Sequence, residues 1–432
     1  MSEVRRLAER SKATARAISS LTEDEKNRAL AAMADALEKN AAAILLANQN
    51  DVEVASSMLV SGEITPSTLD RLRLSEKKLR EMARSIRSVK SLPDPVGRVL
   101  ERTQLDDGLV LEKITCPLGV LVVIFEARPD AITQIASLAI KSANAVIMKP
   151  GREVEASAKV LVDTLRCALR QCGIAEDAFQ LVLGREAAQE LLSFSDLVDL
   201  VIPRGSRQLV EHIQANTRIP VMGHAEGICH VYVDAAADQE MALAIIDDAK
   251  TDYPAVCNAA ETALVHEGIA LEFLPKLAVR LRAKKVRLCG CERTREILGQ
   301  DSTEPVDDWH QEYSDLILAI RVVHDVEEAI AHIHRYSSSH TETIVTNDDK
   351  VAARFLQQVD SAGVFHNAST RFADGFRYGF GAEVGISTSK LHARGPVGLE
   401  GLATYKYLLR GKGQTAGEYR ETKQFKHRKL PL

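Results

Sequence analysis

The segment Gly119-Val-Leu-Val-Val-Ile-Phe-Glu-Ala-Arg-Pro-Asp130 decides the fold class. Its continuous apolar run is rich in β-branched residues and is followed by a polar turn that contains Pro129. This pattern predicts a buried strand over 119–125 and a helix over 130–142. Arg128 in the turn would then lie at the carboxyl edge of a sheet, where open α/β folds bind their ligands. A surface ion pair is the alternative role for this arginine.

Strand-like and helix-like segments alternate along the rest of the chain. The first series has strand-like runs at 145–149, 179–183, 197–202 and 228–233, with helix-like stretches at 130–142, 153–172, 185–193 and 206–215. A second series follows a helix-like stretch at 238–250, with strand candidates at 261–266, 285–289, 315–321, 342–346 and 363–366. This alternation is typical of βαβ units and predicts two α/β domains with mainly parallel sheets. The first hundred residues predict helices, one of which begins at the capping box Thr22-Glu-Asp-Glu25.

Composition excludes several classes of function. The 432-residue chain carries 60 acidic and 55 basic residues, mixed along its length, so nothing indicates binding to nucleic acid or to a membrane surface. We find neither a secretory signal at the N-terminus nor an apolar run of about 18 residues that could span a membrane. The seven cysteines fit neither a disulfide framework nor a zinc site, which favours a cytoplasmic protein without a bound metal. The basic run over 423–429 is expected to be a solvated, partly disordered tail.

Cys257 is the candidate nucleophile. It lies in the polar loop Lys250-Thr-Asp-Tyr-Pro-Ala-Val-Cys257-Asn-Ala-Ala-Glu-Thr262, after a helix and before the first strand of the second domain. A thiolate at a domain junction suits carbonyl chemistry, because one domain can present a cofactor while the other closes over the substrate. A small buried thiol with a structural role is the alternative. No catalytic histidine motif accompanies Cys257, so the residues alone give little support for a hydrolase.

Two strand-to-helix junctions are candidate phosphate sites: Met148-Lys149-Pro-Gly-Arg152 and Ile202-Pro-Arg204-Gly-Ser206. Each combines free helix-end amides, a glycine that permits close backbone approach, and cationic side chains. Ordinary turn chemistry is the alternative. A Gly-x-Gly-x-x-Gly fingerprint is missing, because the nearest run, Gly379-Phe-Gly381-Ala-Glu-Val-Gly385, does not connect a strand to a helix.

Longer motifs resemble the aldehyde dehydrogenase superfamily, and within it the branch that acts on an acyl phosphate. They occur in order over nearly the whole chain: Ile124-Phe-Glu-Ala-Arg-Pro-Asp130, Asp199-Leu-Val-Ile-Pro-Arg-Gly205, Gly223-His-Ala-Glu-Gly-Ile-Cys-His230, Asp252-Tyr-Pro-Ala-Val-Cys-Asn258, Phe365-His-Asn-Ala-Ser-Thr-Arg-Phe-Ala-Asp-Gly375 and Ser387-Thr-Ser-Lys-Leu-His-Ala-Arg-Gly-Pro-Val-Gly-Leu-Glu-Gly-Leu402. The resemblance implies an α/β fold with two Rossmann-like parallel domains and a small oligomerisation hairpin. The expected limits are 1–106 and 118–237 for an NADP(H)-binding domain, 238–385 for a catalytic domain, 107–117 and 402–418 for an oligomerisation flap, and 419–432 for a tail.

The resemblance also implies a set of cofactor-binding residues. Lys149 matches the lysine that grips the adenosine ribose, in a Lys-Pro-x-Glu motif whose glutamate is replaced here by Arg152. An arginine pairs with a 2′-phosphate that a glutamate would repel, so NADP(H) is expected rather than NAD(H). Gly205 and Ser206 match the Gly-Ser pair on the pyrophosphate side. Glu312 stands where a glutamate binds the nicotinamide ribose.

By the same resemblance Cys257 is the catalytic thiol. Oxidising aldehyde dehydrogenases use a glutamate to activate the hydrolytic water; a gap-free reading puts His224 at that position, with Glu226 two residues further on. The family's oxyanion asparagine aligns with Ala127. This leaves the backbone amide of Cys257 and the side chain of Asn258 to hold the developing alkoxide. Because a hydrolytic base is missing at that position, the thioester should be released by a route other than hydrolysis, and the resemblance implies phosphate as the acyl partner.

The implied reaction is the NADPH-dependent reduction of gamma-glutamyl phosphate to glutamate 5-semialdehyde through a Cys257 thioester, as a step of proline synthesis. An NAD-dependent or a CoA-acylating aldehyde dehydrogenase is the alternative, because it would share the fold and Cys257. Arg128, followed by Arg394, is the candidate for binding the anionic groups of the substrate. The resemblance further implies a homo-oligomer formed through strands at 109–115 and 405–410, and functional coupling to glutamate 5-kinase.

Overall fold

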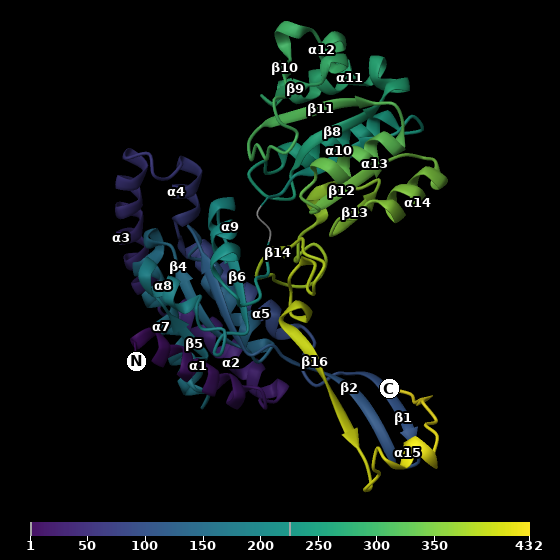
Figure 1. The fold of residues 1–432 in the computed structure, drawn as a ribbon. Coiled ribbons are helices and arrows are strands. Elements are labelled where there is room, and N and C mark those ends of the chain that lie inside the picture. Colours follow the sequence, from purple (N-terminus) through teal and green to yellow (C-terminus); the bar gives the residue numbers. More distant parts are fainter. Residues whose placement is uncertain (1, 224–225) are drawn as a thin grey trace. The chain divides into compact units, whose positions relative to one another are not determined.

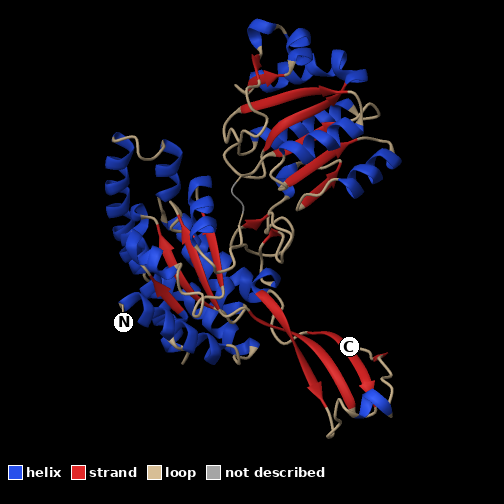
Figure 2. Cartoon of the chain, in the orientation of Figure 1, coloured by secondary structure: helices blue, strands red, loops and turns tan. Residues whose placement is uncertain are grey.

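The computed structural model describes residues 2–223 and 226–432, and it divides into two compact units (Figure 1). The first unit comprises Met1–Met222, Phe380–Gly385 and Val397–Leu432, and the second comprises Gly223–Gly379 and Ile386–Pro396. Each unit contains a parallel sheet with helices around it (Figure 2). The alternation of segments in the sequence predicted this α/β class.

The main sheet of the first unit has four parallel strands in the order β5-β4-β3-β6. They are β3 (Val120–Phe125), β4 (Ala145–Pro150), β5 (Phe179–Leu181) and β6 (Leu200–Arg204). Every residue of β3 is buried, as its apolar run predicted, because β3 pairs with both β4 and β6. The chain passes from β3 outward to β4 and β5 and then returns to β6 on the other side of β3. The carboxyl ends of β3 and β6 therefore form a topological switch point, where such sheets bind ligands.

Helices cover this sheet. They are α1 (Glu3–Ile18), α2 (Glu23–Lys39), α3 (Ala41–Val60), α4 (Pro66–Leu72), α5 (Glu76–Ser91), α6 (Ala131–Lys141), α7 (Glu155–Gln171), α8 (Arg185–Leu191) and α9 (Arg207–Asn216). The predicted capping box begins α2: the Thr22 amide donates to Glu25 Oε2 at 2.8 Å, and the Glu25 amide donates to Thr22 Oγ1 at 3.3 Å. These two bonds satisfy donors that the first turn of a helix leaves free.

The first unit also contains an antiparallel sheet in the order β16-β2-β1-β17. Its strands are β1 (Val99–Asp106), β2 (Leu109–Pro117), β16 (Ala403–Arg410) and β17 (Arg428–Lys429), and a short helix, α15 (Glu418–Glu421), precedes β17. The run over 423–429 is exposed, as expected, but it is folded along β1 rather than partly disordered: Thr103 pairs with Lys429, and the Tyr419 hydroxyl donates to Asp106 at 2.9 Å. The composition explains this difference, because the aromatic residues among the lysines stack on each other, with the rings of Tyr419 and Phe425 4.3 Å apart.

The second unit is built on seven parallel strands in the order β10-β9-β11-β8-β7-β12-β13. They are β7 (Cys229–Val233), β8 (Ala260–His266), β9 (Arg287–Gly290), β10 (Glu304–Pro305), β11 (Ile317–Val323), β12 (Thr341–Val345) and β13 (Gly363–His366). The expected domain limits placed the strand at 228–233 in the first domain, whereas β7 pairs with β8 and β12 in the middle of the second sheet. Sheet membership depends on long-range pairing, which the local pattern of that strand does not encode.

Successive side chains of the central strands belong alternately to two hydrophobic clusters. Val231 and Val233 pack in one cluster with residues of α10 (Gln239–Thr251) and α11 (Glu267–Ala283), whereas Tyr232 packs in the other with α13 (Val326–Tyr336) and α14 (Asp349–Gln358). Helices therefore cover both faces of the sheet, as successive residues of a strand point to opposite faces. The remaining elements are α12 (Glu292–Leu298) and the pair β14 (Ile386–Ser387) and β15 (Gly395–Pro396). Among the described helices, none combines the length and apolar character needed to cross a membrane.

Candidate active site

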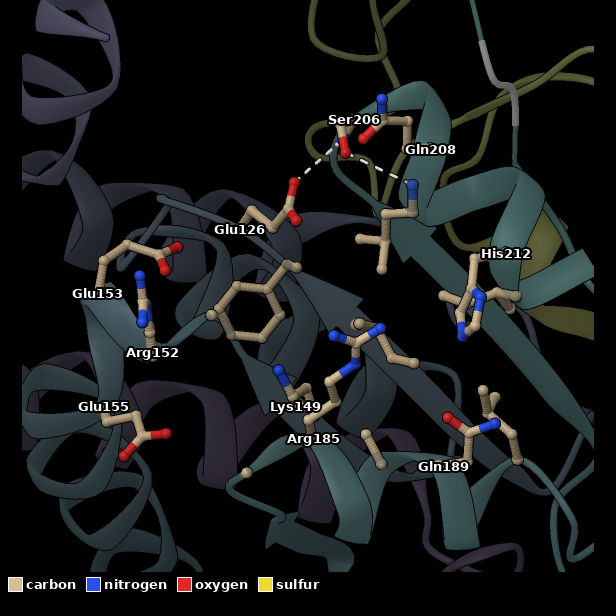
Figure 3. A pocket seen from close by; sticks show the side chains of 18 residues that line it. Glu126, Lys149, Arg152, Glu153, Glu155, Arg185, Gln189, Ser206, Gln208 and His212 are labelled. Atoms are coloured by element: carbon tan, nitrogen blue, oxygen red, sulfur yellow. Dashed lines mark hydrogen bonds between the residues drawn. The ribbon is translucent and has the colours of Figure 1, made fainter. Parts of the chain in front are cut away.

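A cavity of about 870 Å³ lies in the first unit at the carboxyl ends of its parallel strands (Figure 3). Lys149 and Arg152, at the end of β4, line it together with Ser206, which follows β6. The two strand-to-helix junctions singled out in the sequence thus meet at one cavity, because the carboxyl ends of neighbouring parallel strands share one edge of the sheet. A volume of this size is in the range of small-molecule and cofactor sites.

The amino end of α9 opens into this cavity and already holds an anionic oxygen. Ser206 caps the helix, with its hydroxyl accepting from the Leu209 amide at 3.4 Å, and its own amide donates to Glu126 Oε2 at 3.0 Å (Figure 3). A Cβ atom on Gly205 would lie 2.4 Å from Glu126 Oε2 and 2.7 Å from the Leu209 side chain, so a larger residue would have to displace these two side chains. The helix end can therefore bind anionic oxygen atoms, which is the property that a pyrophosphate requires.

Cationic side chains line the same cavity. Arg152 forms an ion pair with Glu63, and both side chains are exposed. Arg185, the first residue of α8, also lines the cavity, although the sequence analysis did not single it out. The sequence did contain a signal for Arg185, because Gly184-Arg185 stands between a predicted strand and a predicted helix, as the other two junctions do. Arg128 is half-buried in the turn after β3 and is not among the residues that line this cavity.

Cys257 lies in the second unit at the amino ends of three adjacent strands. It is half-buried in the turn between α10 and β8, and the Cys229 thiol at the start of β7 donates to its carbonyl oxygen at 3.3 Å. Gly227 approaches the backbone of Cys257 so closely that a Cβ atom would lie 2.1 Å from its carbonyl oxygen. Burial raises the pKa of the Cys229 thiol well above its ordinary value, so Cys229 stays protonated beside Cys257.

His340, the residue before β12, contacts the sulfur atom of Cys257. Its Nε2 atom lies 3.2 Å from Cys257 Sγ, its Nδ1 atom lies 2.9 Å from Thr341 Oγ1, and its ring is buried. This histidine was not predicted from the sequence, since no motif joins it to Cys257, from which it is 83 positions away. The sequence did contain one signal: His340 lies shortly before a predicted strand, as Cys257 does.

The Asn258 side chain is buried and serves to hold a neighbouring loop. Its amide group donates to the carbonyl oxygen of Ala373 at 2.9 Å and to that of Arg371 at 3.5 Å, and its Oδ1 atom accepts from the Arg371 guanidinium. The resemblance implied that this amide holds the developing alkoxide, whereas here its N–H groups donate to the backbone carbonyls of residues 371 and 373. Arg371 also pairs with Asp252 at 3.1 Å, and its hydrogen bond lowers the pKa of that carboxyl group.

The other predicted residues of the second unit lie in separate surroundings. Arg394 pairs with the Asp360 carboxylate at 2.9 Å. Glu312 lies close enough to the buried Lys250–Glu261 ion pair for its charge to act on Glu261, whose pKa is raised to about 7, mainly by burial. His224 lies outside the described residues. Among residues 2–223 and 226–432, no three histidine, cysteine or acidic side chains are grouped as metal ligands would be.

A family model described as "Aldehyde dehydrogenase family" matches residues 1–292. Two features agree with a nicotinamide-dependent enzyme of this kind. In the first unit the amino end of α9 holds a carboxylate oxygen of Glu126, and in the second unit the thiol of Cys257 is half-buried. The chain belongs to the aldehyde dehydrogenase family.

The similar curated relatives carry a narrower name. Gamma-glutamyl phosphate reductase of Cyanothece sp. is 53% identical over 98% of this chain and 97% of the relative. Gamma-glutamyl phosphate reductase 1 of Synechocystis sp. is 52% identical over 97% of this chain and 96% of the relative. These findings confirm the resemblance that the ordered motifs indicated.

Solved structures confirm the fold class. The crystal structure of gamma-glutamyl phosphate reductase from Thermotoga maritima has a TM-score of 0.92 and 39% identity, covering 96% of this chain and all of that one. An acetylating aldehyde dehydrogenase from Geobacillus thermoglucosidasius has a TM-score of 0.66 over 96% of this chain and 97% of that one. Its 18% identity shows a shared fold and nothing more.

Proposed function

We propose that the protein reduces gamma-glutamyl phosphate to glutamate 5-semialdehyde and inorganic phosphate with NADPH, as the second step of proline biosynthesis. The observation that carries this proposal is the 53% identity, over 98% of the chain, to an enzyme named for that reaction. The embedded thiol of Cys257 supports it, because acyl transfer needs a nucleophile that is held in place. A cytoplasmic location and coupling to glutamate 5-kinase belong to the same proposal.

The cavity of the first unit is the proposed NADP(H) site. The amide of Ser206 at the amino end of α9 would bind the pyrophosphate, Gly205 would let it approach, and Lys149 would bind the adenosine ribose. Arg152 would exchange its exposed partner Glu63 for the 2′-phosphate. Glu312 is proposed for the nicotinamide ribose. The cofactor, when bound, supplies the hydride that reduces the acyl group.

Cys257 is the proposed nucleophile. Its thiolate attacks the acyl carbon of gamma-glutamyl phosphate, the C–O bond to phosphate breaks, and a thioester remains on Sγ. Phosphate is a good leaving group, so its departure needs no strong acid to protonate it. The backbone amide of Cys257 is proposed to stabilise the oxyanion, and Asn258 is proposed as a positioning residue, because its amide already holds the 371–373 loop.

Arg128 and Arg394 are the proposed partners of the substrate's phosphate and α-carboxylate. Guanidinium groups bind such anions through paired N–H donors. Arg394 would have to give up Asp360, whose pKa is lowered to about 2 by hydrogen bonds from Lys390 and Arg394. Arg128 is the stronger candidate, since its side chain is half-buried at the carboxyl edge of the first sheet.

A homo-oligomer formed through β16 is also proposed. This strand lies at the edge of its sheet, and Tyr405, Tyr407 and Leu409, which alternate along it, are each about half exposed. An exposed apolar edge strand invites pairing with another copy of the same strand.

The test measures whether the reverse reaction depends on phosphate. Glutamate 5-semialdehyde and NADP⁺ are mixed with the enzyme, with and without inorganic phosphate, and NADPH formation is followed by absorbance. We expect formation of NADPH only with phosphate, and its loss in Cys257→Ala. Full activity without phosphate would indicate an ordinary aldehyde dehydrogenase, and activity that requires coenzyme A would indicate an acylating one; either result would overturn the proposal.

A further inference from the structure

We infer that His340 is a further catalytic residue, which takes the proton of the Cys257 thiol and holds the resulting thiolate. This inference rests on the proposed acyl-transfer function, and it identifies a base that the sequence alone did not reveal. The observation behind it is the 3.2 Å distance between His340 Nε2 and Cys257 Sγ.

The arrangement of strands fixes this contact. Cys257 lies three residues before β8, and His340 directly precedes β12; β7 lies between these two strands and pairs with both. The amino ends of parallel strands lie at one edge of the sheet, so the two residues are brought together from distant points in the chain. The His340 side chain is 1% exposed, and such burial restricts its ring to one orientation.

The second ring nitrogen of His340 has a partner that suits a base. Nδ1 lies 2.9 Å from the hydroxyl of Thr341, and the hydroxyl oxygen can accept a hydrogen bond from Nδ1–H. This tautomer leaves the lone pair of the neutral ring on Nε2, which faces the Cys257 sulfur. Nδ1–H can donate to Thr341 both before and after Nε2 takes a proton, so this partner does not oppose protonation of the ring.

The surrounding titratable groups leave Cys257 as the reactive thiol. They are Cys229 on β7, Glu261 on β8 and Glu342 on β12. Burial raises the pKa of the Cys229 thiol, and the negative charges of Glu342 and Glu261 raise it further. Cys229 stays a thiol, which donates to the Cys257 carbonyl and lies 3.7 Å from His340 Nδ1. It therefore does not compete as a nucleophile.

The proton and the electron pairs balance in the acyl-transfer step. The Sγ–H bond breaks and its proton moves to Nε2, which leaves a thiolate beside an imidazolium. The thiolate electron pair forms the S–C bond with the acyl carbon of gamma-glutamyl phosphate. The C–O bond to phosphate then breaks, and its electron pair leaves with the phosphate, which carries away one proton through the imidazolium or solvent. His340 ends neutral and ready for the next turnover.

The test measures the reactivity of the thiol without cofactor or substrate. Cys257 is alkylated with iodoacetamide in the full-length enzyme, and its rate is followed by mass spectrometry of the peptide that contains it. His340→Ala removes the base, and His340→Gln keeps an N–H donor but cannot take a proton. His334→Gln is the matched control, because His334 is exposed in the same unit and contacts the Gln358 carbonyl instead.

We expect His340→Ala to slow alkylation about tenfold near pH 7 and to leave it nearly unchanged near pH 9.5, where ordinary thiols ionise without help. The His340→Gln enzyme should react at an intermediate rate near pH 7, and the control should react like the wild type. Turnover in the phosphate-dependent assay should fall by about 10² or more in His340→Ala.

Two results would overturn the inference: equal alkylation rates of wild type and His340→Ala near pH 7, or a loss of the same size at both pH values, which indicates a structural defect. If His340→Ala fails to fold by circular dichroism, His340→Gln decides the question in the same way. Failure of the proposed function can be told apart from failure of this inference. In that case the wild type would lack phosphate-dependent activity, whatever the alkylation rates show.

Discussion

Gly227→Ala should displace the turn that carries Cys257, the proposed nucleophile, without contacting its sulfur atom. A Cβ atom at this position would lie 2.1 Å from the Cys257 carbonyl oxygen and 2.4 Å from its Cα atom, whereas ordinary contacts of a Cβ atom begin at 3.4 Å. The atoms it meets are backbone, so the turn has to move by about 1 Å. A shift of that size at a reacting group lowers turnover by about 10²-fold. The overpacking should also lower the free energy of unfolding by about 1–3 kcal/mol.

The assay is phosphate-dependent oxidation of glutamate 5-semialdehyde, with kcat and KM measured for each enzyme. Gly417→Ala is the matched control, because Gly417 has φ of −62° and no atom within 4 Å of an added Cβ. We expect Gly417→Ala to match the wild type in turnover and melting temperature. The reasoning is refuted if Gly227→Ala keeps kcat within about twofold of the wild type while it is folded.

Three further changes test other parts of the structure. Arg152→Ala should raise KM for NADPH about tenfold and leave KM for NADH unchanged, as steady-state kinetics with each cofactor would show. Burial, with added repulsion from His230 and Arg321, lowers the pKa of His332 to about 2. Its unfolded imidazole titrates near pH 6.5, so the folded protein should lose at most about 1.4 kcal/mol of stability per pH unit below that value. The free energy of unfolding, measured with urea between about pH 7 and 5, should depend less on pH in His332→Phe than in the wild type. Tyr407→Lys, on the edge strand β16, should give a smaller species by light scattering if that edge pairs two copies.

Local patterns in the sequence predicted what depends on near neighbours. The run over 120–125 is continuously apolar, so its burial in the sheet could be predicted without any knowledge of its partners. The Thr22–Glu25 capping box is formed by residues three positions apart, and it was predicted for the same reason. The meeting of Lys149 with Ser206 followed from a general rule about the carboxyl ends of parallel strands.

What sequence reasoning missed depends on which strands become neighbours. The strand now called β7 was assigned to the first domain, because its composition does not reveal that it pairs with β8 and β12. Without knowledge of the order of strands in the sheet, no feature of the sequence places His340 near Cys257. The two residues stand before strands that are not neighbours in the sequence, and only the insertion of β7 between them creates the 3.2 Å contact.

The order of the strands also explains what holds Cys257 in place. The residue lies in a loop at one edge of the sheet, where neighbouring loops and strands contact its backbone. Thr370 donates to the carbonyl oxygen of Asn258 at 2.7 Å, and the Asn258 side chain holds the same loop from the other side. Gly227 packs against the Cys257 backbone, and the Cys229 thiol binds its carbonyl oxygen. Every one of these contacts engages backbone or the neighbouring residue and leaves Sγ to His340. A turn that is fixed through its backbone in this way can present one sulfur atom with little loss of entropy at each turnover, which is what covalent catalysis requires of a loop.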